Sequence, residues 1–301
     1  MNIKSSYFNT VIYKINEIKN KNSLSLSNIF DFKEFEDIIT NKKCISFETE
    51  YALFVLTPFH EKYYNIFYMA SDIKQLENIL NIFIAEYKSS MMVRVSVIGK
   101  EPQAGDVAKL FERAGFLLGK RLARMIFKQK EQNIDSIVSD ISSEKISYGK
   151  QNGSDQKSNE IQNISFAVSG DEYEIFEMLQ NEFDICDDNI PEVDDIAENV
   201  KKKQVVVIRD NGKIVSFHYF ELKNNKYYGL YDVTRPEYRS QFLFLGISYF
   251  LNNYFSKNKI VINRSYGWRD TANKRLMKFA LLNNQIPDGV YIYNMKFKVV
   301  N

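Results

Sequence analysis

The chain has 301 residues, a length that two domains of about 150 residues each would account for. Hydrophobic residues make up 45% and charged residues 26%, which excludes a wholly disordered chain, a collagen-like fibre and a disulfide-stapled miniprotein. The 40 Lys and Arg nearly balance the 38 Asp and Glu, so the net charge is +2 and we expect no DNA partner.

In the first 130 residues, helical and strand periodicities alternate. Leu76, Leu80 and Phe83, for example, recur at the spacing of one helix face. The predicted helices cover residues 5–19, 32–39, 73–87 and 107–114, and the predicted strands cover 44–56, 63–70, 92–98 and 122–127. Ser71 or Asp72 is expected to cap the helix that begins at residue 73.

A polar stretch from residue 131 to residue 163 divides the chain. Residues 150–159 contain no apolar side chain and cannot bury enough surface to offset their ordering entropy. We interpret 1–130 and 164–301 as two domains joined by this linker. A short docked helix within the linker is predicted from Ile134, Ile137, Val138 and Ile141.

The second domain repeats the element order of the first. Asn211-Gly212 is a strong hairpin signal between two strands, and Pro191 suits the first turn of a helix. The predicted helices cover 172–183, 191–200, 242–255 and 271–283, and the predicted strands cover 204–209, 213–222, 227–234, 259–264 and 290–299. The repeated order indicates an internal duplication of a mixed α/β unit.

Cysteine and histidine are too scarce for a metal centre or a disulfide framework. Cys44 and Cys186 lie far apart, and His60 and His218 are the two histidines. We expect no metal and a reducing, cytoplasmic setting. The N-terminus lacks a signal-peptide pattern, and no apolar run approaches the roughly 18 residues that cross a bilayer, so no membrane partner is expected.

The segment from Val233 to Gln241, which closes a strand and opens a helix, carries a family resemblance. It resembles the strand-to-helix turn of the GCN5-related N-acetyltransferase (GNAT) superfamily. Asn273 follows the turn Ser265–Trp268 and opens a predicted helix that is similar to the next helix of the family. In the first domain, Arg113–Phe116 resembles the family's motif between that helix and the next strand. The resemblance implies an α+β fold: two tandem GNAT-like domains, each a mostly antiparallel, centrally splayed sheet flanked by helices.

The same resemblance implies a site for acetyl-CoA or CoA as co-substrate in the second domain. A helix N-terminus supplies backbone N–H donors to the pyrophosphate of such a donor. The implied donor-binding residues are Val233, Thr234, Arg239, Ser240, Gln241, Phe242, Leu243, Phe244 and Asn273. Phe242 and Phe244 stand where the family has glycines. The first domain lacks this loop, so we interpret it as a degenerate copy that binds no donor.

The resemblance leaves the acid and the base open. Many family members place a tyrosine acid in the last helix, where this chain has Ala280. Tyr266 is the candidate substitute, with Tyr291 and Tyr293 as alternatives. Asp232 or Glu221 is the candidate base. Asp232 also has a plainer interpretation, as a strand-end aspartate bonded to backbone. His218 lies inside an alternating strand and is interpreted as a packed or cleft-facing histidine.

Asn273 suits a helix N-terminus better than a donor site, and Arg239 also suits a solvated loop. Asp187 and Asp188, with Asp194 and Asp195, suit helix capping and surface charge. Two classes of function remain. The first is an N-acyltransferase, with acetyl-CoA as the expected donor, acting by direct attack on a primary amine of a small molecule, sugar or peptide. An acyl carrier protein or an aminoacyl-tRNA are alternative donors. The second is a non-catalytic binding or assembly protein that retains the fold.

Overall fold

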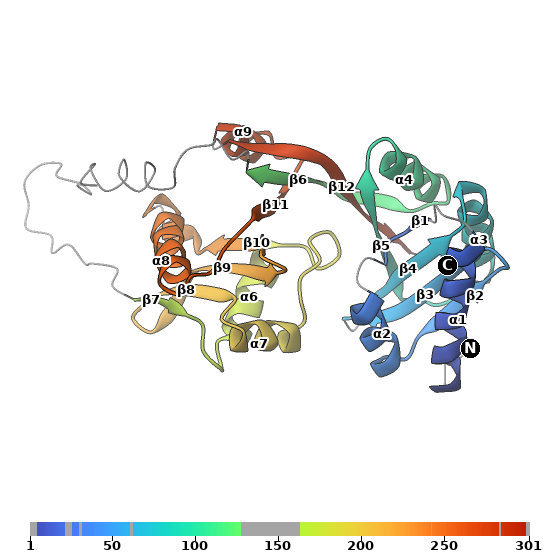
Figure 1. Cartoon of the computed structure of the whole chain (residues 1–301), viewed down its shortest axis with the longest axis horizontal. Helices are drawn as coiled ribbons and strands as arrows, with labels where there is room; N and C mark the ends of the chain where they lie inside the picture. The colour runs from blue at the N-terminus through green and yellow to red at the C-terminus, as the bar shows by residue number, and fades with distance from the viewer. Residues whose placement is uncertain are drawn as a thin grey trace, which may run out of the picture.

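The computed structural model describes residues 5–21, 26–29, 32–60, 63–127, 163–241, 243–282 and 284–298 (Figure 1). The linker predicted over 131–163, apart from Asn163, and the helix expected within it lie outside these residues. No helix in the described part of the chain is long and apolar enough to span a membrane.

The first half contains a helical pair, six strands and two further helices among the described residues. Its elements are α1 (Ser5–Lys21), β1 (Leu26–Ser27), α2 (Phe32–Asn41), β2 (Ile45–Glu48), β3 (Ala52–Phe59), β4 (Tyr63–Ala70), α3 (Ile73–Glu86), β5 (Met92–Lys100), α4 (Gln103–Arg113) and β6 (Leu117–Phe127). The single strand predicted over 44–56 is wrong, because it is a hairpin of β2 and β3. Its turn is closed by a hydrogen bond from the Thr49 amide to the Ala52 carbonyl (2.9 Å).

The second half follows the same order except at its start, where the first strand precedes both opening helices, and at one added 3₁₀ turn. Its elements are β7 (Ile164–Phe166), α6 (Glu172–Glu182), α7 (Val193–Lys201), β8 (Val205–Asp210), β9 (Lys213–Lys223), β10 (Lys226–Thr234), the 3₁₀ turn η1 (Pro236–Gln241), α8 (Leu243–Lys257), β11 (Arg264–Asp270), α9 (Lys274–Leu282) and β12 (Gln285–Phe297). The strand predicted over 259–264 is displaced to 264–270. Ile260 and Ile262 produced the strand-like apolar pattern, but they pack against the α8 core instead. Lys259, with a positive φ of 55°, ends the helix before them.

All strands join one sheet in the order β2-β3-β4-β5-β12-β6-β11-β10-β9-β8-β7, with β1 beside β4. Each half has one parallel pair, and each pair comes apart partway along. Strands β4 and β5 pair only from Tyr63–Ile66 to Met92–Val95, and β10 and β11 pair only from Lys226–Gly229 to Arg264–Gly267. The predicted fold class, a mostly antiparallel and centrally splayed sheet flanked by helices, is confirmed.

The two halves exchange their last strands (Figure 1). Strand β12 of the second half lies between β5 and β6, and β6 of the first half lies between β11 and β12. The sheet of each half is therefore completed by the other, which the division of the sequence into two blocks did not predict.

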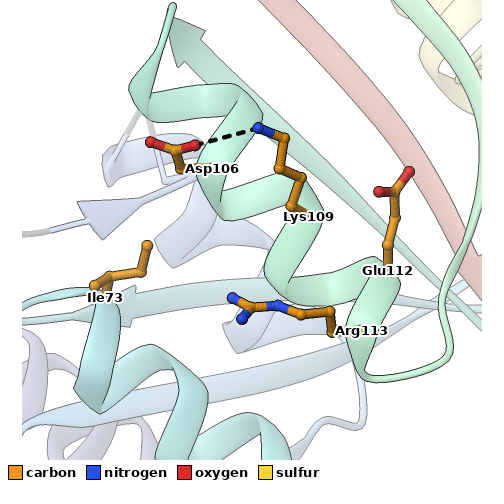
Figure 2. Close-up of a pocket in the computed structure, with 5 residues that line it drawn as sticks. All are labelled: Ile73, Asp106, Lys109, Glu112 and Arg113. Carbon is orange, nitrogen blue, oxygen red and sulfur yellow. Dashed lines mark ion pairs between the residues drawn. The ribbon is translucent and has the colours of Figure 1, made fainter.

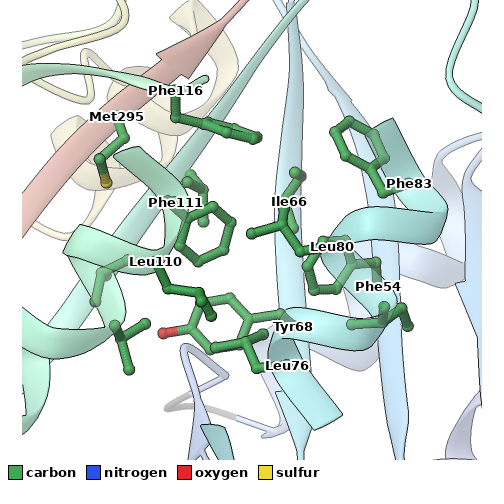
Figure 3. Packing of buried hydrophobic residues seen from close by; sticks show 14 of the residues in the cluster. Phe54, Ile66, Tyr68, Leu76, Leu80, Phe83, Leu110, Phe111, Phe116 and Met295 are labelled. Carbon is green, nitrogen blue, oxygen red and sulfur yellow. The ribbon is translucent and has the colours of Figure 1, made fainter. Parts of the chain in front are cut away.

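Helices cover both faces of each half. In the first half α3 and α4 share one core, and Figure 3 shows Phe54, Phe83 and Phe111 meeting there beneath Met295 of β12. Helices α1 and α2 pack on the opposite face. In the second half α6 and α7 cover one face and α8 covers the other. Burial of one such large apolar side chain stabilises the fold by about 1.5–3 kcal/mol.

Candidate active site

The splay between β4 and β5 is bridged by the side chain of Asn28. Its amide nitrogen donates to the carbonyls of Ile66 on β4 (2.9 Å) and Ser96 on β5 (3.3 Å). Its amide oxygen accepts from the Tyr68 backbone N–H (2.7 Å). Asn28 is only 8% exposed, so a segment of the chain itself occupies the first-half gap. Asp72 caps α3 by accepting from the Gln75 N–H (2.9 Å), as predicted.

The splay between β10 and β11 has no such bridge among the described residues. Backbone pairing ends at Gly229 and Gly267, while β10 continues to Thr234. The Arg235 N–H donates to the Val215 carbonyl (2.9 Å). With the register of β10 against β9, this bond shows which residues of β10 are hydrogen-bonded to β9 and which are not. Because every second residue bonds to β9, the N–H groups of Asp232 and Thr234 point away from β9, into the gap.

A chain of three polar side chains lies beside this gap. The Nδ1 atom of His218 is 2.5 Å from Oδ1 of Asp232, and Nε2 of His218 is hydrogen-bonded to the hydroxyl of Tyr227. His218 is 9% exposed, whereas the side chain of Asp232 is 56% exposed. The chain of hydrogen bonds thus runs from the core beneath α8 to a carboxylate that is open to solvent.

A β-bulge makes this arrangement possible. Tyr227 and Asp232 are five positions apart, so a regular strand would place them on opposite faces of the sheet. The register of β10 against β9 shifts between Gly229 and Tyr231, which leaves Leu230 as the extra residue. The shift brings Asp232 opposite His218 and turns both Tyr227 and Asp232 toward the α8 face.

The charges around Asp232 keep it ionised. Partial desolvation by the neighbouring strands acts to raise the pKa of Asp232, but the interaction and hydrogen bond with His218, together with the charge of Arg269, outweigh it and lower the pKa below its ordinary value. Burial and the nearby Asp232 carboxylate raise the pKa of Tyr227. The hydrogen-bonded series therefore has the neutral phenol of Tyr227 at its buried end and the Asp232 anion at its exposed end.

The other two candidate catalytic residues lie on the opposite face of the sheet. Glu221 follows Phe220, whose ring packs on Phe255 of α8, so alternation directs Glu221 toward α6 and α7. The ring of Tyr266 stacks on Tyr228 (5.1 Å between centroids) with the Arg124 guanidinium 5.0 Å from its centre. The structure does not bring Glu221 or Tyr266 to Asp232.

The turn after β10 holds its two arginines in ion pairs. Arg239 donates from Nε to the Thr234 carbonyl (3.1 Å) and from Nη2 to Oε2 of Glu182 (2.5 Å). Arg235 donates to Oε1 of Glu174 (2.8 Å). Of the other implied donor residues, Ser240 and Gln241 are exposed, Phe244 is 40% exposed, Val233 and Leu243 are buried, and Phe242 lies outside the described residues.

At the start of α9, Asn273 acts as a helix cap, with its Oδ1 accepting from the Leu276 N–H (3.0 Å). Ala280, at the position where many relatives of the fold have a tyrosine acid, is 1% exposed and packs against Ala123 and Met125 of β6. That position belongs to the core, so any acid must come from another element.

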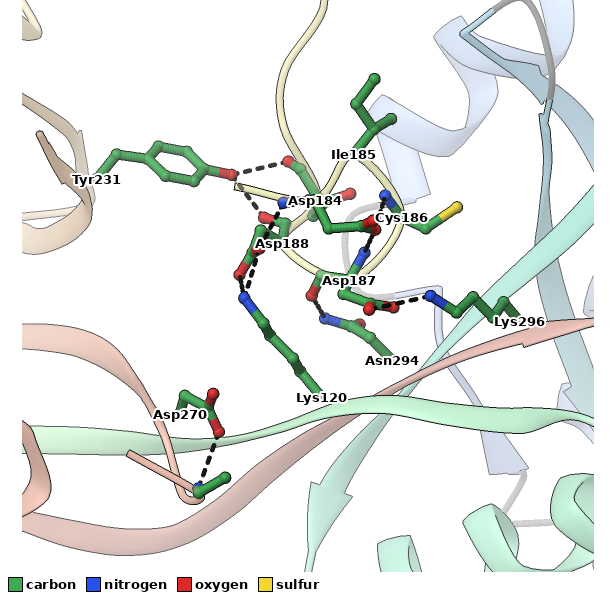
Figure 4. A network of polar contacts seen from close by, with 12 residues as sticks. Lys120, Asp184, Ile185, Cys186, Asp187, Asp188, Tyr231, Asp270, Asn294 and Lys296 are labelled. Carbon is green, nitrogen blue, oxygen red and sulfur yellow. Dashed lines mark hydrogen bonds and ion pairs between the residues drawn. The ribbon is translucent and has the colours of Figure 1, made fainter. Parts of the chain in front are cut away.

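The loop between α6 and α7 ties the halves together (Figure 4). Asp188 pairs with Lys120 of β6 (2.6 Å), and Asp187 pairs with Lys296 of β12 (3.1 Å). The Tyr231 hydroxyl donates to the carbonyl of Asp188 (2.9 Å). Helix capping and surface charge were predicted for Asp187 and Asp188 together with Asp194 and Asp195. Asp195 caps α7 by accepting from the Glu192 N–H (3.2 Å), whereas the position of Asp187 and Asp188 between the two halves corrects the prediction for that pair. In the described part of the chain no cluster of three metal-ligating side chains occurs.

A surface hollow of about 560 Å³ lies in the first half between the start of α3 and α4 (Figure 2). Ile73, Asp106, Lys109, Glu112 and Arg113 line it, and Lys109 pairs with Asp106 (3.6 Å). Two acids accompany the two bases, and Asp72 already occupies the N-terminus of α3. This hollow therefore does not match an anionic pyrophosphate.

Known structures identify the fold. An acetyltransferase of the GNAT family from Colwellia psychrerythraea superposes with a TM-score of 0.52 at 11% identity, over 99% of both chains. A tandem GNAT protein from the clavulanic acid biosynthesis pathway gives 0.50 at 9% identity, over 83% of this chain and 80% of that one. The fold is that of GNAT acetyltransferases.

A glucosamine N-acetyltransferase region of a fungal multi-domain β-N-acetylglucosaminidase gives a TM-score of 0.59 at 10% identity; it covers 99% of this chain but 38% of the fungal one. No protein-family model and no curated protein matches the sequence. At 9–11% identity these likenesses show the fold and nothing finer about the site.

Proposed function

We propose that this chain is an N-acyltransferase whose site is the splay between β10 and β11. The observation that carries the proposal is the contrast between the two gaps. Asn28 bridges the first-half gap, whereas the second-half gap is unbridged among the described residues and has the anionic Asp232 at its edge. The GNAT fold of the solved neighbours supports acyl transfer at this place.

The donor is a thioester, with acetyl-CoA as the first candidate. The unpaired N–H groups of Asp232 and Thr234 are donors that would hold the donor chain beside β10 and polarise its thioester carbonyl. The N-terminus of α8, which follows η1, would contribute further N–H groups to phosphate oxygens.

The acceptor is a primary amine of a small molecule, sugar or peptide. Its nitrogen lone pair attacks the thioester carbonyl carbon, the amide C–N bond forms, the C–S bond breaks, and the departing sulfur and the solvent take up the protons that nitrogen releases. The main rate effect comes from holding amine and thioester together. The Asp232 carboxylate would attract the amine as its cation and accept a hydrogen bond as the proton leaves.

A carrier-protein thioester is a second donor candidate. Arg235 and Arg239 are both committed to glutamates, so the turn holds its described cations in ion pairs rather than presenting them to a pyrophosphate. A phosphopantetheine arm on a carrier protein needs fewer such contacts. The two free, buried cysteines, Cys44 and Cys186, fit a reducing compartment such as the cytoplasm.

The proposal is tested by release of free thiol from acetyl-CoA in a screen of primary amines. We expect turnover with at least one amine, and a loss of about 100-fold in kcat/KM for Asp232→Asn. Glu221→Gln serves as the matched carboxylate change on the opposite face and should retain most of the activity. Loss of activity in Glu221→Gln with Asp232→Asn unaffected would move the site to the other face.

A further inference from the structure

In the Tyr227–His218–Asp232 series the histidine is buried and the aspartate is exposed, the reverse of a familiar histidine–aspartate pair. In a serine-hydrolase triad a buried carboxylate orients a histidine that faces the substrate. Here the histidine is 9% exposed and the carboxylate side chain is 56% exposed. The member that can meet a ligand is therefore Asp232, and His218 can act only through it.

We propose that His218 is a positioning residue, which fixes the Asp232 carboxylate so that its free oxygen faces an amine in the gap. The proposal deepens, and rests on, the acyltransferase function proposed above. Oδ1 of Asp232 is engaged by Nδ1 of His218, so Oδ2 is the oxygen left for the acceptor. Tyr227 acts behind His218 and fixes the proton on its ring.

The hydrogen-bond logic selects one form of the ring. An ionised carboxylate only accepts, so Nδ1 of His218 must carry the hydrogen that it donates to Asp232. In a neutral ring with its hydrogen on Nδ1, Nε2 is the acceptor for the hydroxyl of Tyr227, a phenol that burial keeps protonated. The ring lies parallel to Phe220 (5.7 Å, 17°), which fixes its plane.

The groups that face Asp232 come from three strands. His218 lies on β9, Tyr227 on β10 and Arg269 on β11. From α8, Phe255 packs against Tyr227 and adds an apolar wall (6.1 Å). Two of the three polar groups favour the ionised form of Asp232, so removing His218 weakens both the hold on the carboxylate and the preference for its charge.

The first test reads the ring directly and needs no activity. The chain has two histidines, so ¹⁵N spectra of the whole protein contain two imidazole rings, and His60→Gln assigns the second signal. At pH 9 we expect His218 as the Nδ1–H tautomer in the wild type and loss of that form in Asp232→Asn. An Nε2–H ring, or a doubly protonated ring, overturns the proposal.

The second test separates a positioning role from a merely structural one. With acetyl-CoA and glucosamine as probe acceptor, His218→Ala should raise the acceptor KM about tenfold and move the acid limb of kcat/KM to higher pH. His218→Asn retains a donor near Nδ1 and should restore the KM. An unchanged KM and acid limb in His218→Ala overturns the proposal. If glucosamine gives no turnover, the proposed function fails at that probe while the ring spectra still decide the role of His218.

Discussion

The two halves of this molecule share one fold and treat the same gap in opposite ways. In the first half, Asn28 links Ile66 on β4 to Ser96 on β5 and closes the splay from within. In the second half, the splay stays unbridged among the described residues, and a polar chain ends there in the open carboxylate of Asp232. Under the proposed function, two halves with similar strand order keep one gap as structure and the other as a site, because fold and site are separable.

The exchanged strands make each half depend on the other for part of its sheet. A substitution of Met295 tests this dependence and has the largest expected effect. Met295 comes from the last strand of the second half, yet it is 1% exposed in the first-half core (Figure 3). Met295→Ala should lower the free energy of unfolding by about 2–5 kcal/mol. We expect one cooperative transition in a urea titration followed by circular dichroism, with Lys298→Ala, an exposed neighbour, as the near-neutral control. Two separated transitions would show that the halves unfold independently.

Opening the first-half gap is expected to have a smaller effect. Asn28→Ala leaves the carbonyls of Ile66 and Ser96 and the Tyr68 N–H without their partner. The free energy of unfolding should fall by about 1–3 kcal/mol, the usual cost of buried polar groups left unpaired. Acetyl-CoA affinity should not change, because the proposed site is in the other half.

Ser27→Ala is the matched control, since among the described residues the Ser27 hydroxyl accepts from the nearby Ile29 N–H alone (2.9 Å). Thermal melts and calorimetric titration measure both quantities. Loss of acetyl-CoA binding in Asn28→Ala with unchanged stability would place the donor in the first half and reverse the comparison.

The charge at the second gap gives the smallest effect, and its sign follows from the lowered pKa of Asp232. A carboxyl group with a lowered folded-state pKa stabilises the fold above its ordinary pKa, and this contribution disappears as the pH falls through the folded-state value. Because the side chain is 56% exposed, the contribution should stay below about 1 kcal/mol.

Urea titrations of the wild type and Asp232→Asn at pH 7 and pH 3 test this sign. The stability advantage of the wild type should shrink on acidification. An advantage that grows toward pH 3 would mean that the carboxyl group is stabilised in its protonated form, contrary to the ion-pair account.

Local signals in the sequence predicted most of the elements. Asn211-Gly212 has the two positive φ values, 49° and 81°, that its hairpin turn requires. The apolar spacing of α3 matches its buried face of Leu76, Ile79, Leu80 and Phe83. These features depend on neighbouring residues only, which is why a single sequence reveals them.

The features that make the site depend on pairing between distant strands. The two-residue turn at Asn224 and Asn225 alone would place His218 opposite Tyr231, with Asp232 on the other face. The bulge at Leu230 moves the register by one and joins His218 to Asp232. Gly229 beside the bulge is consistent with one, but neither the register shift nor the exchange of β6 and β12 follows from a local pattern. The hydrogen-bonded series could therefore not be predicted, although His218 and Asp232 were both noted.

The measurement that tests the central claim most directly is calorimetric titration of acetyl-CoA into a pair of Thr234 variants. The Thr234 N–H points into the gap rather than to β9, so Thr234→Pro removes a proposed donor contact without breaking the β9 ladder. Thr234→Val keeps the N–H and removes only the hydroxyl that bonds to Ser216 (2.8 Å). The account predicts one site per chain, retained in Thr234→Val and weakened at least about tenfold in a folded Thr234→Pro. Equal binding by the two variants, or no binding by the wild type, would contradict it.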